Sequence, residues 1–339
     1  MAAEKDGFTY YCADHLLIES ALASYVERHT LFRRVSRLGI AVSGGADSVA
    51  LFHLLLPLCR KADIDVTLLH LNHGLRAEAE DDERSVRALA ADADIPCLSH
   101  RAMLAYPPPA GKSLEMSARA ARMAFFQHCF KEARLDAVAT GHQADDVAET
   151  LLLRLARGAG AAGLSGLRPR STTGNCRLIR PLLAISAHAL RAWLHEHGFD
   201  WREDASNRDD SIPRNFIRNS LLPRLEETWV PHLRARLCQS AETLREDDAL
   251  LEALASQQLI TLSAGGTEET PSRLPVAFLL RQPIALQRRI LRQWLYRQSQ
   301  APAAGLESVH ALLAHCQKSG NWQRALPGNA LAVCRDAFL

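Results

Sequence analysis

The strongest constraint on this chain is a turn rich in glycine and serine between an apolar strand and an apolar helix. The turn is Ser43-Gly44-Gly45-Ala46-Asp47-Ser48, which follows the apolar run Leu38–Val42 and precedes the helical pattern Val49–Leu58. Adjacent glycines allow positive φ and a close approach of ligand to backbone. The N–H groups of such a turn and of the following helix attract an anion. An ordinary turn would explain the glycines alone, but not the two serines and Asp47 around them. The segment therefore predicts a phosphate-binding loop.

Apolar strands alternate with helical patterns through the first half of the chain. Further strands are predicted at residues 66–71, 95–99 and 137–140, and helices at 78–93, 113–134 and 145–156. This alternation predicts an α/β fold with a doubly wound parallel sheet. Ligands of such sheets bind beyond the carboxyl ends of the strands, at a switch point in strand order. The phosphate-binding loop is predicted to lie there.

The character of the sequence changes near residue 225, where we place a domain boundary. Residues 1–225 are predicted to form the domain that carries the phosphate-binding loop, and residues 226–339 a smaller, mainly helical accessory domain. Helical patterns cover residues 226–262, 276–297 and 306–317, and a turn enters a strand within 325–333. A length of 339 residues fits two domains.

Composition limits the classes of function. The formal net charge is +2, so a face that binds nucleic acid would have to be local. None of the eight cysteines forms a C-x-x-C pair, which argues against zinc or iron–sulfur sites and favours reduced thiols. No apolar run has membrane-spanning length, and the N-terminus lacks the form of a signal peptide. The predicted localisation is cytoplasmic, with no membrane partner.

Polar residues follow the second and fourth predicted strands. Asn72, His73 and Arg76 are candidates for contact with a nucleotide or substrate, although a lone histidine at a strand end is more often structural. After the fourth strand, the adjacent carboxylates Asp145 and Asp146 could hold Mg²⁺ together with ATP phosphates. Alternatively, they oppose the dipole of the helix that begins there.

The same helix start brings His142, Asp146 and Glu149 within two turns.

Two further segments carry arginines at helical spacing. Glu115, Arg119 and Arg122 share one helix face, which could be a solvated ladder of ion pairs or a phosphate-binding surface.

Arg214 and Arg218 are four residues apart on a helix predicted to start near Pro213. Together with Arg202, Arg208 and Arg224 they form a local basic patch. Contact with phosphate and ordinary surface charge are both compatible with this pattern.

Taken in order, these segments resemble the tRNA(Ile)-lysidine synthetases of the PP-loop ATP pyrophosphatase superfamily. The resemblance covers about residues 38–225, and Ala139–Leu164 is its most specific part. The matching motifs are SGGADS, HLNHGLR, E-x-x-x-R-x-x-R, ATGHQADDVAETLLLRLARGAGAAGL, IRPLL, WREDASN and RNFIRN. Longer relatives carry a further C-terminal domain for which this sequence shows no match.

The resemblance implies an ATP-dependent ligation of free L-lysine to the wobble cytidine in the CAU anticodon of tRNA(Ile). ATP would adenylate the oxygen on ring carbon 2 and release diphosphate, and the lysine amine would then displace AMP. Asp47 and Asp146 are candidates for binding the lysine amine, removing its proton or coordinating Mg²⁺, and the sequence does not separate these roles. Arg122 and His142 would stabilise charge at the α-phosphate.

The resemblance also implies that residues 1–225 are the ATP-binding catalytic domain and residues 226–339 an accessory domain that binds tRNA. The remaining implied roles concern single residues that bind ATP or substrate. The ATP-binding residues would be Ser43, Gly44, Gly45, Ala46, Asp47 and Ser48, and the substrate- or tRNA-binding residues Asn72, His73, Arg76, Glu149, Arg214 and Arg218. The nearest alternative function is that of a PP-loop tRNA thiolase, which commonly needs paired cysteines. A non-enzymatic nucleotide-binding module is the alternative from another class. The sequence leaves open whether the chain forms a homodimer.

Overall fold

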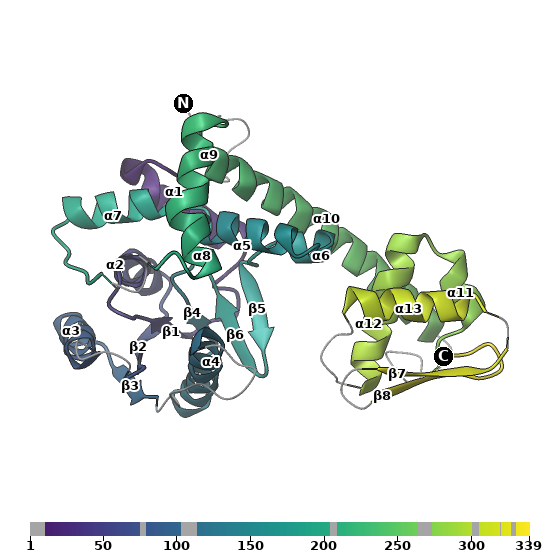
Figure 1. Ribbon diagram of the computed structural model, residues 1–339. Coiled ribbons are helices and arrows are strands. Elements are labelled where there is room, and N and C mark those ends of the chain that lie inside the picture. The colour runs from purple at the N-terminus through teal and green to yellow at the C-terminus, as the bar shows by residue number, and fades with distance from the viewer. Residues whose placement is uncertain are drawn as a thin grey trace. The chain divides into compact units, whose positions relative to one another are not determined.

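The structure, a computed structural model, describes residues 11–74, 79–102, 114–203, 209–263, 273–299, 305–318, 320–326 and 330–339 (Figure 1). The chain divides into two compact units, one of residues 1–158 and 165–242 and the other of residues 159–164 and 243–339. Residues 226–242 therefore pack with the first unit, and residues 159–164 with the second. The predicted domains, 1–225 and 226–339, differ from these units in both places, and as functional domains they stay a prediction.

The first unit is built on a six-stranded sheet in the order β3-β2-β1-β4-β6-β5. The strands are β1 (Arg37–Ala41), β2 (Asp65–Asn72), β3 (Cys97–Arg101), β4 (Ala137–Ala139), β5 (Arg170–Thr173) and β6 (Cys176–Ile179). All neighbours are parallel except β5 and β6, which pair as an antiparallel hairpin. The predicted doubly wound parallel sheet is confirmed. The hairpin was not predicted, because β5 is a mostly exposed edge strand without an apolar run.

Helices cover both faces of this sheet, which is why its central strands are apolar on both sides. They are α2 (Ala46–Lys61), α3 (Ala79–Asp92), α4 (Leu114–Glu132), α5 (Ala144–Ala156) and α7 (Ala187–Glu196), with η1 (His15–Leu17) and α1 (Ile18–Arg28) before the sheet. α2 and α3 lie on one face and α4 on the other (Figure 1). The strand order reverses between β1 and β4. Their carboxyl ends therefore border the crevice in which a doubly wound sheet binds its ligand.

The loops that leave β1 and β4 approach each other closely at Gly141. A Cβ atom on this residue would lie 3.1 Å from the carbonyl oxygen of Asp47 and 3.2 Å from the backbone nitrogen of Ser48. Both atoms belong to the backbone that opens α2, which cannot move without disturbing the phosphate-binding loop. Glycine at position 141 thus allows the two loops to share one crevice.

A continuous helical segment follows α7 in the first unit. It comprises α8 (Pro213–Phe216), the π-helical turn η3 (Ile217–Leu221) and α9 (Leu222–Thr228). α10 (Leu233–Ser263) then begins in the first unit and ends in the second. The predicted helix 226–262 is therefore two helices. The break includes Pro231, which has no N–H to donate, and His232 with a φ of 60°.

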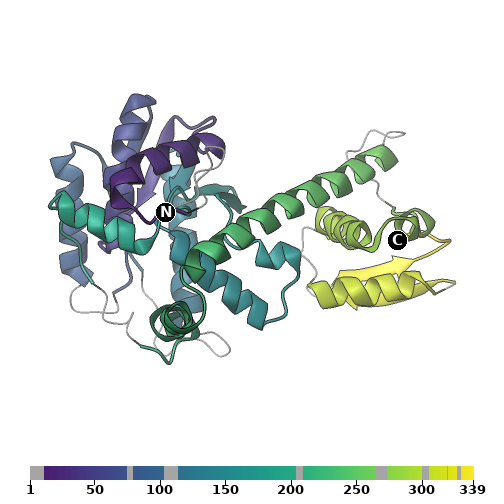
Figure 2. The same ribbon diagram turned by 90° about the horizontal axis from the view of Figure 1, so that it is seen from above.

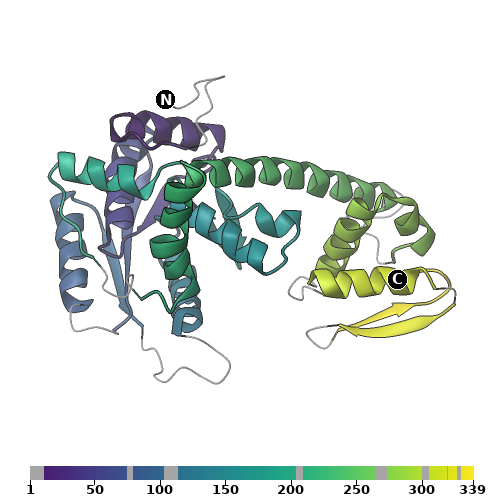
Figure 3. The same cartoon turned by 45° about the horizontal axis from the view of Figure 1, so that its top comes forward.

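The second unit is mainly helical, as predicted. It contains α6 (Ala161–Leu164), α11 (Val276–Arg281), α12 (Ile284–Ser299), α13 (Leu306–Cys316) and the hairpin of β7 (Trp322–Leu326) and β8 (Ala330–Cys334). The hairpin lies against α13 (Figures 2 and 3). The predicted helix 276–297 is interrupted before Pro283. No helix among the described residues is long and apolar enough to cross a bilayer.

We expect Gly141→Ala to lower the free energy of unfolding of the first unit by about 1–3 kcal/mol, because the new methyl group lies too close to the peptide group between Asp47 and Ser48. Gly45→Ala is the matched control, since its Cβ would meet neighbours only at 3.7 Å or more. Urea denaturation of both variants measures the difference. Equal stabilities would contradict the tight approach at Gly141.

Candidate active site

A cavity of about 1480 Å³ lies within the first unit, beyond the carboxyl ends of β1 and β4. This is the place that the strand order predicts. The predicted site residues in its wall are Ser43, Gly45, Ala46, Asp47, Ser48, His73, Arg122, His142, Asp146, Arg214 and Arg218. Gly44, Asn72 and Glu149 are not part of the wall, and Arg76 lies outside the described residues.

The phosphate-binding loop is held in shape by Ser48. Its hydroxyl donates to the carbonyl oxygen of Gly45 at 2.8 Å and accepts from the backbone N–H of Ser43 at 3.1 Å. Gly44 has a φ of +90°, a conformation that favours glycine. Because the proton of Ser48 is used for Gly45, Ser43 is the donor in the 3.2 Å contact between the two hydroxyl groups. The N–H groups at the start of α2 that the loop does not use remain as donors to an anion, and Ser43 can join them if its hydroxyl rotates.

Asp47 contributes a poorly compensated carboxyl group to the cavity wall. Its Oδ1 atom is buried and has no hydrogen-bond partner among the described residues. Burial, followed by the nearby carboxylate of Asp146, raises the pKa of Asp47 to about 7, while Arg191 and Arg218 act in the opposite direction. A carboxyl group with this pKa can accept a proton near neutral pH, which an ordinary aspartate does poorly.

His142 lies opposite, at the end of β4. Burial lowers the pKa of its imidazole to about 4, so the ring is neutral at neutral pH. Its Nδ1 atom is 2.9 Å from the hydroxyl oxygen of Thr140. The tautomer that accepts from Thr140 carries its proton on Nε2 and can donate a hydrogen bond to a ligand. His142 can therefore contribute a hydrogen bond to a phosphate, but no full charge.

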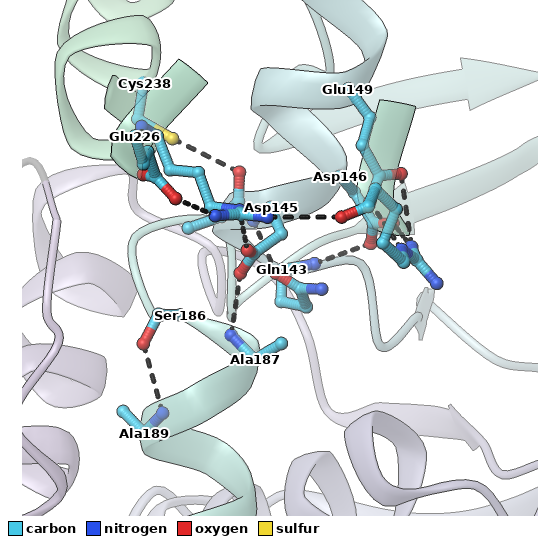
Figure 4. A network of polar contacts seen from close by, with 12 residues as sticks. Gln143, Asp145, Asp146, Glu149, Ser186, Ala187, Ala189, Glu226 and Cys238 are labelled. Carbon is cyan, nitrogen blue, oxygen red and sulfur yellow. Dashed lines mark hydrogen bonds and ion pairs between the residues drawn. The ribbon is translucent and has the colours of Figure 1, made fainter. Parts of the chain in front are cut away.

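Asp146 and Glu149 form a compact cluster with two arginines (Figure 4). Arg214 donates from Nη2 to Asp146 and from Nε to Glu149, each at 2.6 Å. Arg218 donates to Glu149 from Nε at 2.5 Å and to Asp146 from Nη2 at 3.1 Å. The side chain of Glu149 is fully buried.

This cluster changes the interpretation of the predicted basic patch. The guanidinium groups of Arg214 and Arg218 point to α5 and are neutralised there, so they are not a free cationic surface. Contact of these two residues with an RNA backbone stays a prediction. Arg224, also assigned to the patch, is exposed on α9.

Asp145 carries a second set of contacts from the same helix start (Figure 4). One oxygen accepts from the backbone N–H of Ala187 at 2.8 Å, and the other lies 2.8 Å from Nε of Arg234. Arg234 also pairs with Glu226. The first turn of α5 thus fixes the starts of both α7 and α10, which is more than compensation of a helix dipole.

The side chain of Asn72 makes its hydrogen bonds within the protein and does not line the cavity. Its amide nitrogen donates to Ala79 and Glu83, and its oxygen accepts from the backbone N–H of Gly74 at 2.8 Å. These contacts shape the end of β2 and the start of α3. A binding role for Asn72 remains only a prediction, and its neighbour His73 faces the cavity.

Several residues of the wall were not among the predicted site residues. They are Asp82, Arg180, Arg191, Trp201, Arg202, Glu226 and Arg234. Arg180 could have been predicted from the sequence, because it lies in the IRPLL motif. Arg202 was assigned only to the basic patch, whereas its backbone N–H donates to Gly44 at 3.0 Å and its side chain pairs with Asp82 at 3.4 Å. Arg191 lies on an ordinary amphipathic helix and Arg234 near the start of a long charged helix, and nothing in the sequence marks either residue.

The fit of a magnesium ion differs between the two predicted aspartates. Asp146 accepts from both arginines through Oδ1 and from the backbone N–H of Gln143 through Oδ2, so both of its oxygens already have partners. Asp47 has a buried oxygen without a partner. The described residues contain no group of three or more acidic, histidine or cysteine side chains placed to hold a metal. A magnesium ion here would depend mainly on ligands from ATP, with Asp47 the better protein ligand.

Comparison with known proteins identifies the family of this chain. A family model described as a PP-loop domain matches residues 17–225. A tRNA(Ile)-lysidine synthase from Geobacter sulfurreducens is 40% identical over 82% of this chain and 57% of its own length. One from Symbiobacterium thermophilum is 36% identical over 92% of this chain and 67% of its own length. The chain belongs to the PP-loop family of tRNA(Ile)-lysidine synthases.

The family match does not extend over whole relatives. The chain spans 57% and 67% of the lengths of these two lysidine synthases. Among solved structures, a U34-tRNA thiolase from Methanococcus maripaludis superposes with a TM-score of 0.56 at 15% identity, over 68% of this chain and 80% of the thiolase. That likeness supports the PP-loop fold alone.

We expect Arg218→Ala to lower the free energy of unfolding by about 1–3 kcal/mol, because Glu149 stays buried with Arg214 as its remaining partner. Arg224→Ala removes an exposed arginine from the same helical segment and should change stability by less than about 0.5 kcal/mol. Chemical denaturation compares the two. If Arg218→Ala were as neutral as Arg224→Ala, its side chain would not be compensating Glu149.

The raised pKa of Asp47 predicts how the stability of the protein depends on pH. Its folded-state pKa of about 7 exceeds the ordinary value of 3.8, so between these values the folded protein keeps a proton that the unfolded chain has lost. Stability therefore falls as pH rises through this window. We expect Asp47→Asn to be more stable than the wild type at pH 8 by about 2–4 kcal/mol, and nearly equal at pH 4.

Denaturation of both proteins at the two pH values measures this effect. Asp65→Asn is the control, because Asp65 is an exposed carboxylate at the start of β2. A difference between Asp47→Asn and the wild type that does not change with pH would show that Asp47 titrates normally.

Proposed function

We propose that the protein ligates free L-lysine to the wobble cytidine in the CAU anticodon of tRNA(Ile), using ATP and releasing AMP and diphosphate. The observation that carries this proposal is the placement of Asp47, whose carboxyl group faces the same cavity as the phosphate-binding loop and His142. One cavity then offers an anion site for ATP beside a base for an amine. The identity of the substrates is inferred from membership of the lysidine synthase family.

In the first step, the base oxygen on ring carbon 2 attacks the α-phosphorus of ATP and diphosphate leaves. The loop at Ser43–Ser48 binds the departing diphosphate through Ser43 and the N–H groups that open α2. Arg122 provides positive charge near the α-phosphate, and neutral His142 donates a hydrogen bond. A magnesium ion that arrives with ATP would neutralise phosphate charge and would take most of its ligands from the phosphates.

In the second step, the ε-amine of lysine attacks ring carbon 2, and the bond from that carbon to the adenylated oxygen breaks to release AMP. A free lysine amine has a pKa of about 10.4, so it must lose a proton before it can attack. Asp47 accepts this proton. Its raised pKa makes it a stronger base than an exposed aspartate, and its ionised form attracts the ammonium group.

Recognition of tRNA requires the wobble base to leave the stack and enter the cavity. Single-stranded loops are the usual targets of sequence-specific RNA recognition, because their bases can be splayed out. The cavity is larger than a typical small-molecule pocket of about 300–1,000 Å³, which suits the joint binding of ATP, an amino acid and a nucleotide.

The cysteines favour this function over a tRNA thiolase. None of the eight lines the cavity, all of them being among the described residues. Burial raises the pKa of Cys59 and of Cys129 to about 12, which keeps these thiols protonated and unreactive. A sulfur-transfer step at this cavity would have no protein thiolate near it.

Incubation with ATP, Mg²⁺, radiolabelled lysine and the minor isoleucine tRNA should transfer label to the tRNA in a form that resists mild base. An aminoacyl ester would be lost under these conditions, whereas the carbon–nitrogen bond of lysidine would remain. Asp47→Asn should lower the rate by about 100-fold or more, because general base catalysis contributes roughly 10²–10⁴-fold.

Two controls accompany this assay. Replacing lysine by labelled sulfide or cysteine tests the thiolase alternative, and a tRNA lacking the CAU anticodon tests recognition. The proposed reaction is refuted if ATP is consumed with the correct tRNA but no base-stable lysine label appears.

A further inference from the structure

Eight arginines line the cavity, and most of them are used by the protein itself. Arg214, Arg218 and Arg234 pair with carboxylates of α5, and Arg202 pairs with Asp82. Arg180 donates to the carbonyl oxygen of Arg168 at 2.7 Å. These five guanidinium groups are held by protein oxygens, so they are poorly available to a substrate.

Arg191 differs from these five. It is exposed to the cavity from α7, and no hydrogen bond or ion pair joins it to any part of the chain that the structure describes. Two other cavity arginines, Arg119 and Arg122, come from α4, and Arg122 is already assigned to the α-phosphate. Arg191 is thus a cation on a separate wall of the cavity, without an evident structural task.

Two packing contacts fix the position of this cation. α7 packs against α2, the helix that begins with the phosphate-binding loop and carries Asp47. The start of α7 is tied to α5 by the hydrogen bond from Ala187 to Asp145. Ser186 caps the helix by accepting from the backbone N–H of Ala189 at 3.1 Å. Arg191 follows Ala187 by one helical turn, so it stands at a fixed place relative to Asp47.

A free amino acid brings a carboxylate as well as its reactive amine. We propose that Arg191 binds the α-carboxylate of the lysine substrate and thereby places the ε-amine at Asp47. This inference rests on the proposed function and deepens it, since it assigns how an amino acid is distinguished from a simple amine. Arginine suits the task because its guanidinium group can donate two parallel hydrogen bonds to a carboxylate.

The electrostatics of Asp47 support this arrangement. Among the positive groups that act on the pKa of Asp47, Arg191 has the largest effect, which places the two side chains within interaction range. A substrate with an anionic and a cationic end could therefore lie between them, each end facing the opposite charge. If Arg191 bound a phosphate of ATP instead, no positive group would hold the carboxylate of lysine, and the ammonium end would not be directed to Asp47.

The experiment compares lysine with cadaverine, which is lysine without its carboxylate. The wild type should prefer lysine strongly, in ATP-dependent ligation to tRNA and in direct binding measured by calorimetry. Arg191→Ala should raise the KM for lysine about 10- to 100-fold, the usual cost of a hydrogen bond to a charged group, and leave cadaverine nearly unaffected. Arg191→Lys should restore part of the preference, because it keeps the charge and loses the paired geometry.

Arg236→Ala is the matched control, since Arg236 is exposed on α10 and does not line the cavity. If Arg191→Ala keeps the full preference for lysine, or raises the KM for ATP instead, the assignment of Arg191 is wrong while the proposed function stands. A wild type that neither binds nor incorporates lysine overturns both. The inference is supported if Arg191→Ala loses the preference for lysine over cadaverine and Arg236→Ala keeps it.

Discussion

The first unit depends on the carboxylates at the start of α5. Asp145 holds α7 and α10, and Asp146 with Glu149 holds the helical segment of Arg214 and Arg218. These helices form one side of the cavity, so the pairs hold that side in place. Removing one member of a buried ion pair is costly, because the remaining charge loses its partner in a medium of low dielectric constant.

This arrangement divides the charges of the cavity into two classes. Four of the eight arginines are neutralised by carboxylates and help to build the wall, the acidic partners being Asp82, Asp145, Asp146, Glu149 and Glu226. Asp47 and Arg191 lack strong partners of their own and face the space where a substrate would lie. Burial then acts differently on the titrating groups, raising the pKa of Asp47 to about 7 and lowering that of His142 to about 4. Near neutral pH the cavity therefore holds a base beside an uncharged hydrogen-bond donor.

Local sequence patterns predicted most of the fold. The strands of the parallel sheet and the helices between them follow from apolar runs separated by turn residues, and the phosphate-binding loop follows from Ser43–Ser48. The errors arose where local signals are weak. β5 is an exposed edge strand with little apolar content, and the breaks near Pro231 and Pro283 lie within long helical patterns. Proline weakens such a pattern at one residue only, so the surrounding periodicity concealed both breaks.

The sequence by itself determined the class of site, because glycine conformation, hydroxyl donors and a strand–turn–helix pattern are local properties. It also showed which carboxylates stand at the start of α5. Only the tertiary structure decided their tasks, since Asp146 is paired with arginines more than sixty positions away whereas Asp47 is not. Charge compensation and burial depend on which distant segments meet, and these segments are brought together only when the sheet and its helices pack.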